Sequence, residues 1–270
     1  MPNKTPDPTF PQVQSVARAA ELLEITAGKG AEGISLTEIA SRLGVAKSTA
    51  LALARTLCAA GLLRTIEPGP MYVLGLTLLR LGDLVAQQTS IVEIASPVVR
   101  RLAEQTGFTT RLAVNEEGFP VFVERIDGPG SVRFHAPLGQ REEPHATAAG
   151  KAILAEQRDE EVDRVLSLTA MARYTAHTIV DREQLKAELA RIRAEGYATD
   201  DEEEAEGIFC VGAAFRNHAG ECLGALSVTG LKVDIPLREV RELGNLVRAH
   251  ADELTVLLGG TVRTPSSINH

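Results

Sequence analysis

The chain has 270 residues, of which 44% are hydrophobic and 24% charged, and its formal net charge is −8 at pH 7. These proportions are typical of a soluble globular protein and exclude a disordered or low-complexity chain. No segment approaches the roughly 18 consecutive apolar residues of a membrane span, and the Pro-rich start lacks the apolar stretch of a secretory signal. Because three scattered cysteines predict neither a disulfide framework nor a metal site, we expect a cytoplasmic protein without metal or cofactor.

The charge is unevenly distributed along a chain whose length predicts two domains. Residues 1–75 contain seven Lys or Arg and six Asp or Glu, a balance of +1, whereas residues 76–270 have a balance of −9. The acidic charge therefore belongs to the second part. The first part can still bind a polyanion if its cations share one face.

The first 75 residues predict three helices followed by two short strands. A helix is expected over residues 15–27 with Ser15 as its cap, and the S-x-x-E sequence from Ser35 to Glu38 predicts a capping box that opens a second helix. Gly44 ends that helix, a third helix follows over residues 47–60, and strands over 62–66 and 71–74 flank the turn Pro68-Gly69-Pro70. This order is typical of a helix-turn-helix with a wing.

The start and outer face of the third helix are the candidate DNA-contacting surface. In a helix-turn-helix the N-terminal end of the second helix enters the major groove, where hydroxyls and free N–H groups bind phosphate and longer side chains read bases. The candidates are Lys47, Ser48, Thr49, Leu51 and Arg55, with Arg64 on the wing. The alternative is a small helical bundle with a solvated face, but Leu51 and Ala52 are unusually apolar for such a face.

The remaining residues predict one long helix and then a mixed domain. The helix is expected from Leu76 to about Ile94, and its wide apolar stripe favours a partner chain. Strands are predicted over residues 110–114, 120–126, 132–136, 197–200, 208–215 and 222–228. Helices are predicted over residues 96–106, 148–156, 158–168, 181–195 and 236–258. This order predicts an α+β fold in which helices pack on an antiparallel sheet.

A candidate site for a small polar ligand, most simply a carboxylate, lies in the second part. The small residues after His145 open a helix and leave its N–H groups free for an anion. Ser227 and Thr229 share one face of a strand because they are two residues apart. The candidates are Ala148, Ala149, Asp200, Cys210, Ser227 and Thr229.

Several of these residues have simpler interpretations. Cys210, between Phe209 and Val211, has the neighbours of a buried small hydrophobic residue, although it is also the candidate nucleophile of a small-molecule hydrolase or transferase. Arg111 is either a carboxylate clamp or a surface charge. The acidic run 200–204 is expected to be a solvated turn apart from Asp200. Surface or capping roles remain open for His145, Lys151, Thr175 and Thr178.

Short segments in sequence order resemble the isocitrate-lyase-regulator (IclR) type of bacterial transcription factor over nearly all of residues 13–258. In the first part they are Val13-Gln14-Ser15-Val16-Ala17-Arg18-Ala19, Ser35-Leu36-Thr37-Glu38-Ile39-Ala40, Lys47-Ser48-Thr49 and Tyr72-Val73-Leu74-Gly75. In the second part they are His145-Ala146-Thr147-Ala148-Ala149-Gly150-Lys151-Ala152, Gly196-Tyr197-Ala198-Thr199-Asp200, Gly207-Ile208-Phe209-Cys210-Val211 and Ala225-Leu226-Ser227-Val228-Thr229-Gly230. The resemblance implies a regulator that binds an operator in double-stranded DNA and a small effector, commonly an organic or aromatic acid. It also implies homodimers, often paired into dimers of dimers, and effector contacts on the six candidates named above.

The resemblance also implies a domain order. We expect a mobile arm over residues 1–11, a winged helix-turn-helix domain over 12–75, a linker helix over 76–94, a GAF-like effector-binding domain over 95–260 and a flexible tail over 261–270. One departure concerns the third helix: Leu51 and Ala52 stand where the family usually has an aromatic residue or His and then Arg. Arg55, one turn later, is expected to replace that arginine. A rival hypothesis is a ligand sensor whose first domain binds protein instead of DNA.

Overall fold

The computed structural model describes residues 13–88, 90–128, 138–235 and 239–262, which form two compact units that meet at residues 89 and 90. The expected arm over residues 1–11, the strand over 132–136 and nearly all of the tail over 261–270 lie outside the described residues. No helix in the described ranges is long and apolar enough to cross a membrane.

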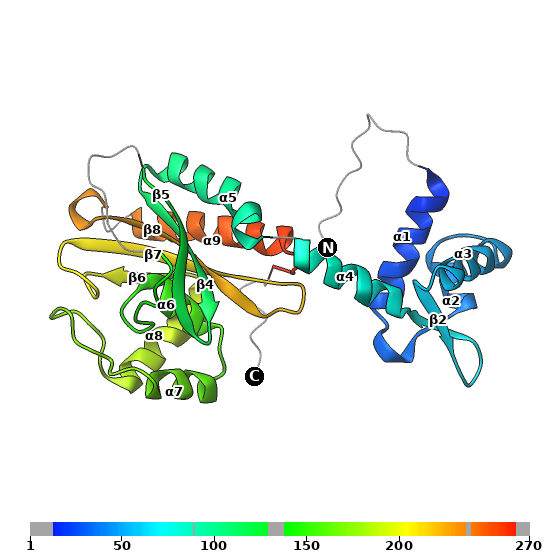
Figure 1. The fold of residues 1–270 in the computed structure, drawn as a ribbon, viewed down its shortest axis with the longest axis horizontal. Coiled ribbons are helices and arrows are strands. Elements are labelled where there is room, and N and C mark those ends of the chain that lie inside the picture. The colour runs from blue at the N-terminus through cyan, green and yellow to red at the C-terminus, as the bar shows by residue number, and fades with distance from the viewer. Residues whose placement is uncertain (1–12, 89, 129–137, 236–238, 263–270) are drawn as a thin grey trace. The chain divides into compact units, whose positions relative to one another are not determined.

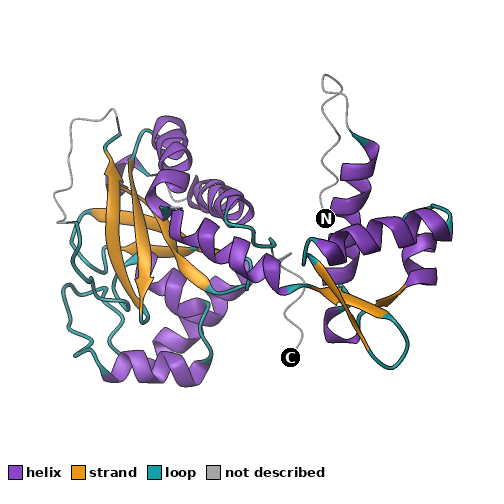
Figure 2. Ribbon diagram, turned by 45° about the vertical axis from the view of Figure 1, so that its right-hand side comes forward, coloured by secondary structure: helices purple, strands orange, loops and turns teal. Residues whose placement is uncertain are grey.

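The first unit is a three-helix bundle with a small antiparallel sheet of strand order β1-β3-β2 (Figure 2). Its core is formed by α1, α2 and α3, which bury Leu22, Ile39 and Leu57 against one another. The element bounds are α1 Gln14–Ala27, η1 Gly30–Glu32, β1 Ile34–Ser35, α2 Leu36–Arg42, α3 Lys47–Ala59, β2 Leu63–Ile66, β3 Met71–Leu74 and α4 Leu76–Gln88.

Local signals position the two helices of the helix-turn-helix. Ser35 caps α2, because its side chain accepts a hydrogen bond from the Glu38 backbone N–H at 3.2 Å. After Leu43, Gly44 adopts a positive φ of 60°, which is favourable for glycine, and the chain turns directly into α3. The prediction for Ser15 is wrong: α1 begins at Gln14 after Val13, so Ser15 lies inside the helix and caps nothing.

The predicted single helix over residues 76–94 is also wrong. The helix α4 ends at Gln88, and Ser90 has an extended backbone (φ −80°, ψ 125°) from which the next helix, α5 (Ile91–Thr106), begins. The apolar periodicity continues across this break, which is why pattern alone predicts one helix. Ser90 and Glu93 have the spacing of a capping box and mark the boundary, although the Ser90 side chain makes no capping bond.

The second unit is a five-stranded antiparallel sheet with helices on both faces, in the strand order β5-β4-β8-β7-β6 (Figure 1). One face packs against α5 and α9, and the other against α6 and α8. The strands are β4 Thr109–Glu116, β5 Phe119–Ile126, β6 Ala198–Asp201, β7 Ile208–Arg216 and β8 Cys222–Leu231. The helices after α5 are α6 Ala148–Ala155, α7 Asp159–Ser167, α8 Arg182–Glu195, η2 Lys232–Asp234 and α9 Val240–Leu257.

Candidate functional site

The outer face of α3 is exposed along its length. Ala50, Ala54 and Leu57 are buried in the core of the first unit, which turns the opposite side of the helix toward solvent. The residues exposed there include Lys47, Ser48, Thr49, Ala52 and Arg55. Leu51 is half-buried at the edge of this face, so Ala52 occupies its centre.

The first turn of α3 is open to an anion. Ala46, its N-cap residue, provides no side-chain cap, and the turn contains no acidic residue. The first N–H groups of a helix have no partner within the helix, and the helix dipole favours negative charge beside them. Lys47, Ser48 and Thr49 surround this end and are all exposed. The arrangement is suited to a phosphate oxygen.

The cations of this surface are free of ion pairs with the described residues. Lys47 and Arg55 on α3 and Arg64 on β2 are exposed and form no salt bridge with any described carboxylate. In contrast, Lys29 and Arg42 of the same unit both pair with Glu38, at 2.8 and 3.4 Å. Arg18 on α1 and Arg80 on α4 also have no salt bridge with a described carboxylate, so the third helix and the wing carry three of the five described cations that remain available in this unit.

In the second unit, the sheet register brings four predicted ligand residues side by side. Asp200 on β6 is opposite Cys210 on β7, and Cys210 is opposite Thr229 on β8. Ser227 lies two residues before Thr229 and is therefore on the same face of β8. All four are at most 3% exposed.

The start of α6 covers this part of the sheet. A Cβ atom added to Gly212 on β7 would lie 2.8 Å from the Ala148 carbonyl carbon and 3.0 Å from the Ala149 nitrogen. Only glycine therefore permits this close approach. Ala148 and Ala149 form the first turn of α6 and are buried. The structure thus brings together all six residues predicted for the effector.

Two polar atoms of this group lack partners among the described residues. The Ser227 Oγ and the Asp200 Oδ2 are buried without a hydrogen bond, whereas Asp200 Oδ1 accepts from the backbone N–H groups of Glu203 and Glu204. Buried polar groups are nearly always hydrogen-bonded, so such atoms mark a place where a ligand or water is expected.

Arg111, for which the sequence left two interpretations open, is a charged neighbour of these residues. Arg111 on β4 is opposite Ser227 in the register and is 5% exposed; its guanidinium lies 3.8 Å from the centre of the Phe122 ring. Its Nη1 is 3.4 Å from Glu142 Oε1. The surface-charge interpretation of Arg111 is therefore wrong. Arg111 can be placed beside Ser227 only once β4 is known to pair with β8. No sequence motif predicts that Glu142 lies beside Arg111.

The acidic run 200–204 and its neighbours are also more buried than predicted. Glu203 is 7% exposed and forms an ion pair with Lys151, which is fully buried on α6, so Lys151 is not a surface group. Thr175 and Thr178 donate hydrogen bonds to the carbonyls of Glu202 and Glu203 and so hold this loop. His145 is buried, and its Nε2 lies 3.0 Å from the Ala172 carbonyl.

Burial changes the acidity of two carboxyls in this region. It raises the pKa of Asp200 to about 7, although the backbone N–H of Glu203 opposes the rise, and it raises the pKa of Glu142 to about 7, although Arg111 opposes it. Each carboxyl therefore binds a proton more tightly in the folded than in the unfolded chain. Their contribution to stability is fully present below the unfolded pKa and is lost as the pH rises through about 7.

Replacing Asp200 with Asn is expected to remove its part of this pH dependence. Between pH 5 and pH 8 the free energy of unfolding of the wild type should fall relative to that of Asp200→Asn by about 2 kcal/mol. Urea unfolding of both proteins at the two pH values measures the difference. The raised pKa of Asp200 is contradicted if the difference in free energy of unfolding between the two proteins is the same at pH 5 and pH 8. It is also contradicted if that difference favours the wild type more at pH 8.

Cys210 has the surroundings of a structural or ligand-contacting thiol. It is 2% exposed, and its Sγ lies 3.3 Å from the Thr229 Oγ1. Burial raises the pKa of the Cys210 thiol well above its ordinary value, and the charge of Asp200 adds to this effect. A nucleophilic cysteine needs the opposite shift. No cluster of three or more His, Cys, Asp or Glu among the described side chains is arranged to hold a metal ion.

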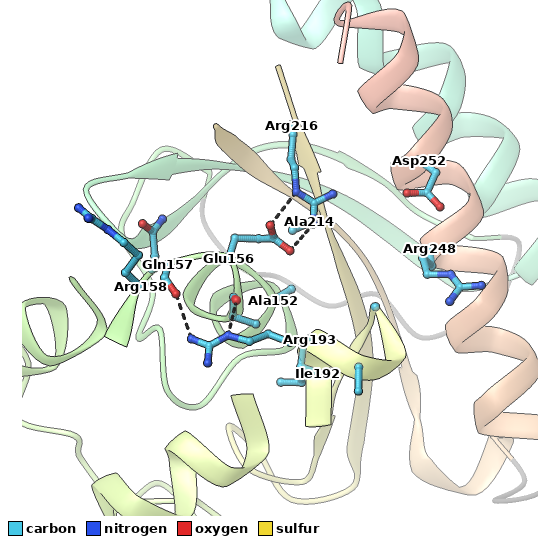
Figure 3. A pocket seen from close by; sticks show the side chains of 13 residues that line it. Ala152, Glu156, Gln157, Arg158, Ile192, Arg193, Ala214, Arg216, Arg248 and Asp252 are labelled. Atoms are coloured by element: carbon cyan, nitrogen blue, oxygen red, sulfur yellow. Dashed lines mark hydrogen bonds and ion pairs between the residues drawn. The ribbon is translucent and has the colours of Figure 1, made fainter. Parts of the chain in front are cut away.

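A cavity of about 260 Å³ lies at the other end of α6, between that helix, α8, β7 and α9 (Figure 3). Three of its four arginines have partners: Arg216 pairs with Glu156, Arg193 donates to the Ala155 and Gln157 carbonyls, and Arg248 donates to the Glu195 carbonyl. The contacts of Arg193 and Arg248 cap carbonyls at the ends of α6 and α8. None of the six predicted effector residues lines this cavity.

Comparisons with known proteins cover both units. Residues 15–67 match the family model of the IclR helix-turn-helix domain, and residues 84–256 match that of the bacterial transcriptional regulator IclR C-terminal domain. The acetate operon repressor of Salmonella typhimurium is 33% identical over 262 residues, 96% of this chain and 95% of the relative. The transcriptional repressor IclR of Escherichia coli is 32% identical over 255 residues, 94% of this chain and 93% of the relative.

Solved structures show the same architecture. The Agobacterium tumefaciens repressor BlcR has a TM-score of 0.77 at 25% identity, over 93% of this chain and 99% of that one. A putative IclR transcriptional regulator from Silicibacter has a TM-score of 0.82, also at 25% identity, over 93% of this chain and 98% of that one.

Proposed function

The chain belongs to the IclR family of bacterial transcriptional regulators, and we propose that its operator contacts come from Lys47, Ser48, Thr49, Leu51 and Arg55 on α3 and from Arg64 on the wing. The protein is a DNA-binding regulator with an effector-binding domain. The observation that carries the proposal is that Lys47, Arg55 and Arg64 are exposed and form no ion pair with a described residue, in a unit where the start of α3 has no side-chain cap. The relatives named above are repressors, which supports repression as the direction of control.

We further propose that the effector is a small organic or aromatic acid bound by Ala148, Ala149, Asp200, Cys210, Ser227 and Thr229. The helix dipole and the N–H groups of Ala148 and Ala149, which precede the Gly150 N–H that Thr147 caps, favour a carboxylate, and the buried Ser227 Oγ is a hydrogen-bonding group without a partner among the described residues. The buried Cys210 thiol with its raised pKa supports a role in ligand contact and not in catalysis, so we propose that the protein is not an enzyme.

The proposed active form is a homodimer, with pairs of dimers as the larger assembly. Leucines on α4 are exposed in the single chain, at 75% for Leu76, 73% for Leu79 and 41% for Leu81, and a second copy would bury them. Two α3 helices in a dimer read half-sites about one helical turn or a multiple apart. The effector acts by binding more tightly to one arrangement of the dimer than to the other.

DNA binding is tested with the full chain and the region upstream of its own gene, at about 50 and 200 mM salt. We expect the affinity to fall by about 10³-fold or more between these concentrations, because several phosphate contacts release counterions. An acidic protein without a basic binding face shows no such loss. A DNA affinity that does not depend on salt concentration, or an absence of binding at low salt, contradicts the proposed operator contacts.

A further inference from the structure

Four charged side chains gather beside the proposed effector residues, and we call them the charged cluster: Arg111, Glu142, Asp200 and Glu204. Arg111 is in register with Ser227, and Asp200 is in register with Cys210. Glu142 lies 3.4 Å from Arg111. Glu204 follows Asp200 in the loop after β6, where its backbone N–H donates to Asp200, and its charge acts on Arg111, Glu142 and Asp200. The cluster thus borders the predicted ligand position.

The cluster contains one cation and three carboxyls. Another buried cation, Lys151, acts on Asp200 and lowers its pKa, but its ion pair is with Glu203, so it offsets this excess only in part. Arg111 and Glu142 are 6% and 15% exposed at their side chains and share a single long contact at 3.4 Å. A buried arginine in a fully formed ion pair usually makes two shorter bonds to its carboxylate. The ion pair between Arg111 and Glu142 therefore lacks the second, shorter bond of a fully formed pair.

The unused atoms of the cluster point to a missing group. Arg111 Nε, Glu142 Oε2 and Asp200 Oδ2 are all buried without a hydrogen-bond partner among the described residues. Two of the three are carboxylate oxygens, which accept hydrogen bonds when ionised. Leaving such atoms unpaired in a buried site is costly, so a ligand that supplies donors and positive charge there gains binding free energy.

The surface next to the charged cluster is suited to an anion. Thr147 caps α6 by accepting from the Gly150 N–H, so the N–H groups of Ala148 and Ala149 are the ones left for an anion, and Ser227 and Thr229 add hydroxyls beside them. Ser227 and Arg111 are neighbours on adjacent strands, where paired residues lie about 5 Å apart. The anion-binding surface and the carboxyl-rich cluster are thus close enough for one small molecule to contact both.

We propose that the effector of this protein is a small zwitterion, an amino acid or a close analogue, whose carboxylate lies at the start of α6 and whose ammonium group lies among Glu142, Asp200 and Glu204. This inference rests on the proposed function, in which this face of the sheet binds the effector. Arg111 is the residue that keeps the carboxyls apart from one another and orients Glu142. Burial raises the pKa of both Glu142 and Asp200 more than the nearby cations Arg111 and Lys151 lower it, which agrees with carboxyls that an added ammonium group would stabilise.

A dicarboxylate is the main competing ligand class, with its second carboxylate bound to Arg111. In that arrangement a fourth carboxyl joins the charged cluster, which already contains three carboxyls and one arginine. Like charges in a buried site repel, so the dicarboxylate would need bound protons or would displace Glu142. The charge balance therefore favours the zwitterion.

The test uses the full chain and a matched set of probes in thermal-shift and calorimetric titrations. The zwitterions are the unbranched amino acids from glycine to 6-aminohexanoate, each compared with the monocarboxylate, the dicarboxylate and the amine of the same length. At least one zwitterion is expected to bind about tenfold or more tightly than its matched compounds, as hydrogen bonds to charged groups allow. Stronger binding by a monocarboxylate or dicarboxylate, or no binding by any zwitterion, overturns the proposal.

A double variant tests the residues. Glu142→Gln with Glu204→Gln keeps the side-chain size but removes two negative charges, so it should weaken zwitterion binding about tenfold or more and improve dicarboxylate binding. The control is Glu160→Gln with Glu183→Gln, which makes the same change in net charge at exposed positions of α7 and α8 and should leave both affinities unchanged. Equal effects of the two double variants contradict the assignment to the cluster.

The proposed operator contacts and the inference about effector chemistry can be contradicted independently of each other. If zwitterions do not bind but the salt-dependent binding to the upstream DNA is intact, only the inference about effector chemistry is lost. If DNA binding itself is absent, the proposed operator contacts fail whatever the probes show.

Discussion

Replacing Arg55 with Ala is expected to weaken operator binding by about 5- to 150-fold and to reduce the preference for the correct base. This range corresponds to the roughly 1–3 kcal/mol that one side chain contributes when it binds a guanine through two hydrogen bonds. Arg55 is exposed on the outer face of α3, one turn after Ala52, and forms no ion pair with a described residue. Binding to the upstream region and to single-base variants of it, at one fixed salt concentration, measures both effects.

Lys47→Ala is the informative comparison for this experiment. Lys47 lies at the start of α3, where a contact to phosphate is expected, so its loss should weaken binding to all sequences alike and reduce the salt slope by about one. Arg158→Ala, at an exposed position of the second unit, is the control that should change neither. If Arg55→Ala leaves both affinity and base preference untouched, Arg55 does not replace the arginine that the family usually has earlier in this helix.

Replacing Lys151 with Met is expected to lower the free energy of unfolding by about 3–5 kcal/mol, the usual cost of removing one partner of a buried ion pair. Lys151 is fully buried on α6 and bonds to Glu203, whose side chain is 9% exposed. The variant leaves the Glu203 carboxyl in a site that raises its pKa by burial, now without the cation that opposed the rise. Urea unfolding at pH 7, followed by circular dichroism, measures the change.

The double variant Lys151→Met with Glu203→Leu separates the charge from the packing. Two apolar residues of similar volume often replace a buried ion pair with little loss of stability, so the double variant should recover most of the lost free energy. The Glu203 backbone N–H still donates to Asp200 in this variant, so the loop keeps that contact. A single substitution that costs less than about 1 kcal/mol would show that the pair is solvated and not buried.

Features set by neighbouring residues were predictable from the sequence. The Ser35 cap of α2, the turn at Gly44 and the Asp181 cap of α8 each depend on a few consecutive residues, and all three occur in the structure; the return half of the predicted capping box does not form, because the Glu38 carboxylate pairs with Lys29 and Arg42. The antiparallel sheet with helices also follows from the order of short patterns. The break after Gln88 was missed because hydrophobic periodicity continues through it.

The candidate site also has features that the sequence predicts and features that only the tertiary structure shows. Ser227 and Thr229 were predictable as a pair because they are two residues apart on one strand. The burial of Arg111, Lys151 and Glu203 was not, because charged residues are normally exposed and only tertiary pairing allows them to be buried. Glu142 contacts Arg111 across 31 residues of sequence, a distance over which no local pattern carries information.

Glu142 and Glu204 differ from Asp200, Cys210 and Thr229 in one respect: they lie outside the strands. Substitutions at these two positions leave the backbone ladder of the sheet intact, so under the proposed assignment the preference for an effector can diverge between gene duplicates without loss of the scaffold. The same separation makes positions 142 and 204 the first to randomise when the protein is re-engineered as a biosensor for another metabolite.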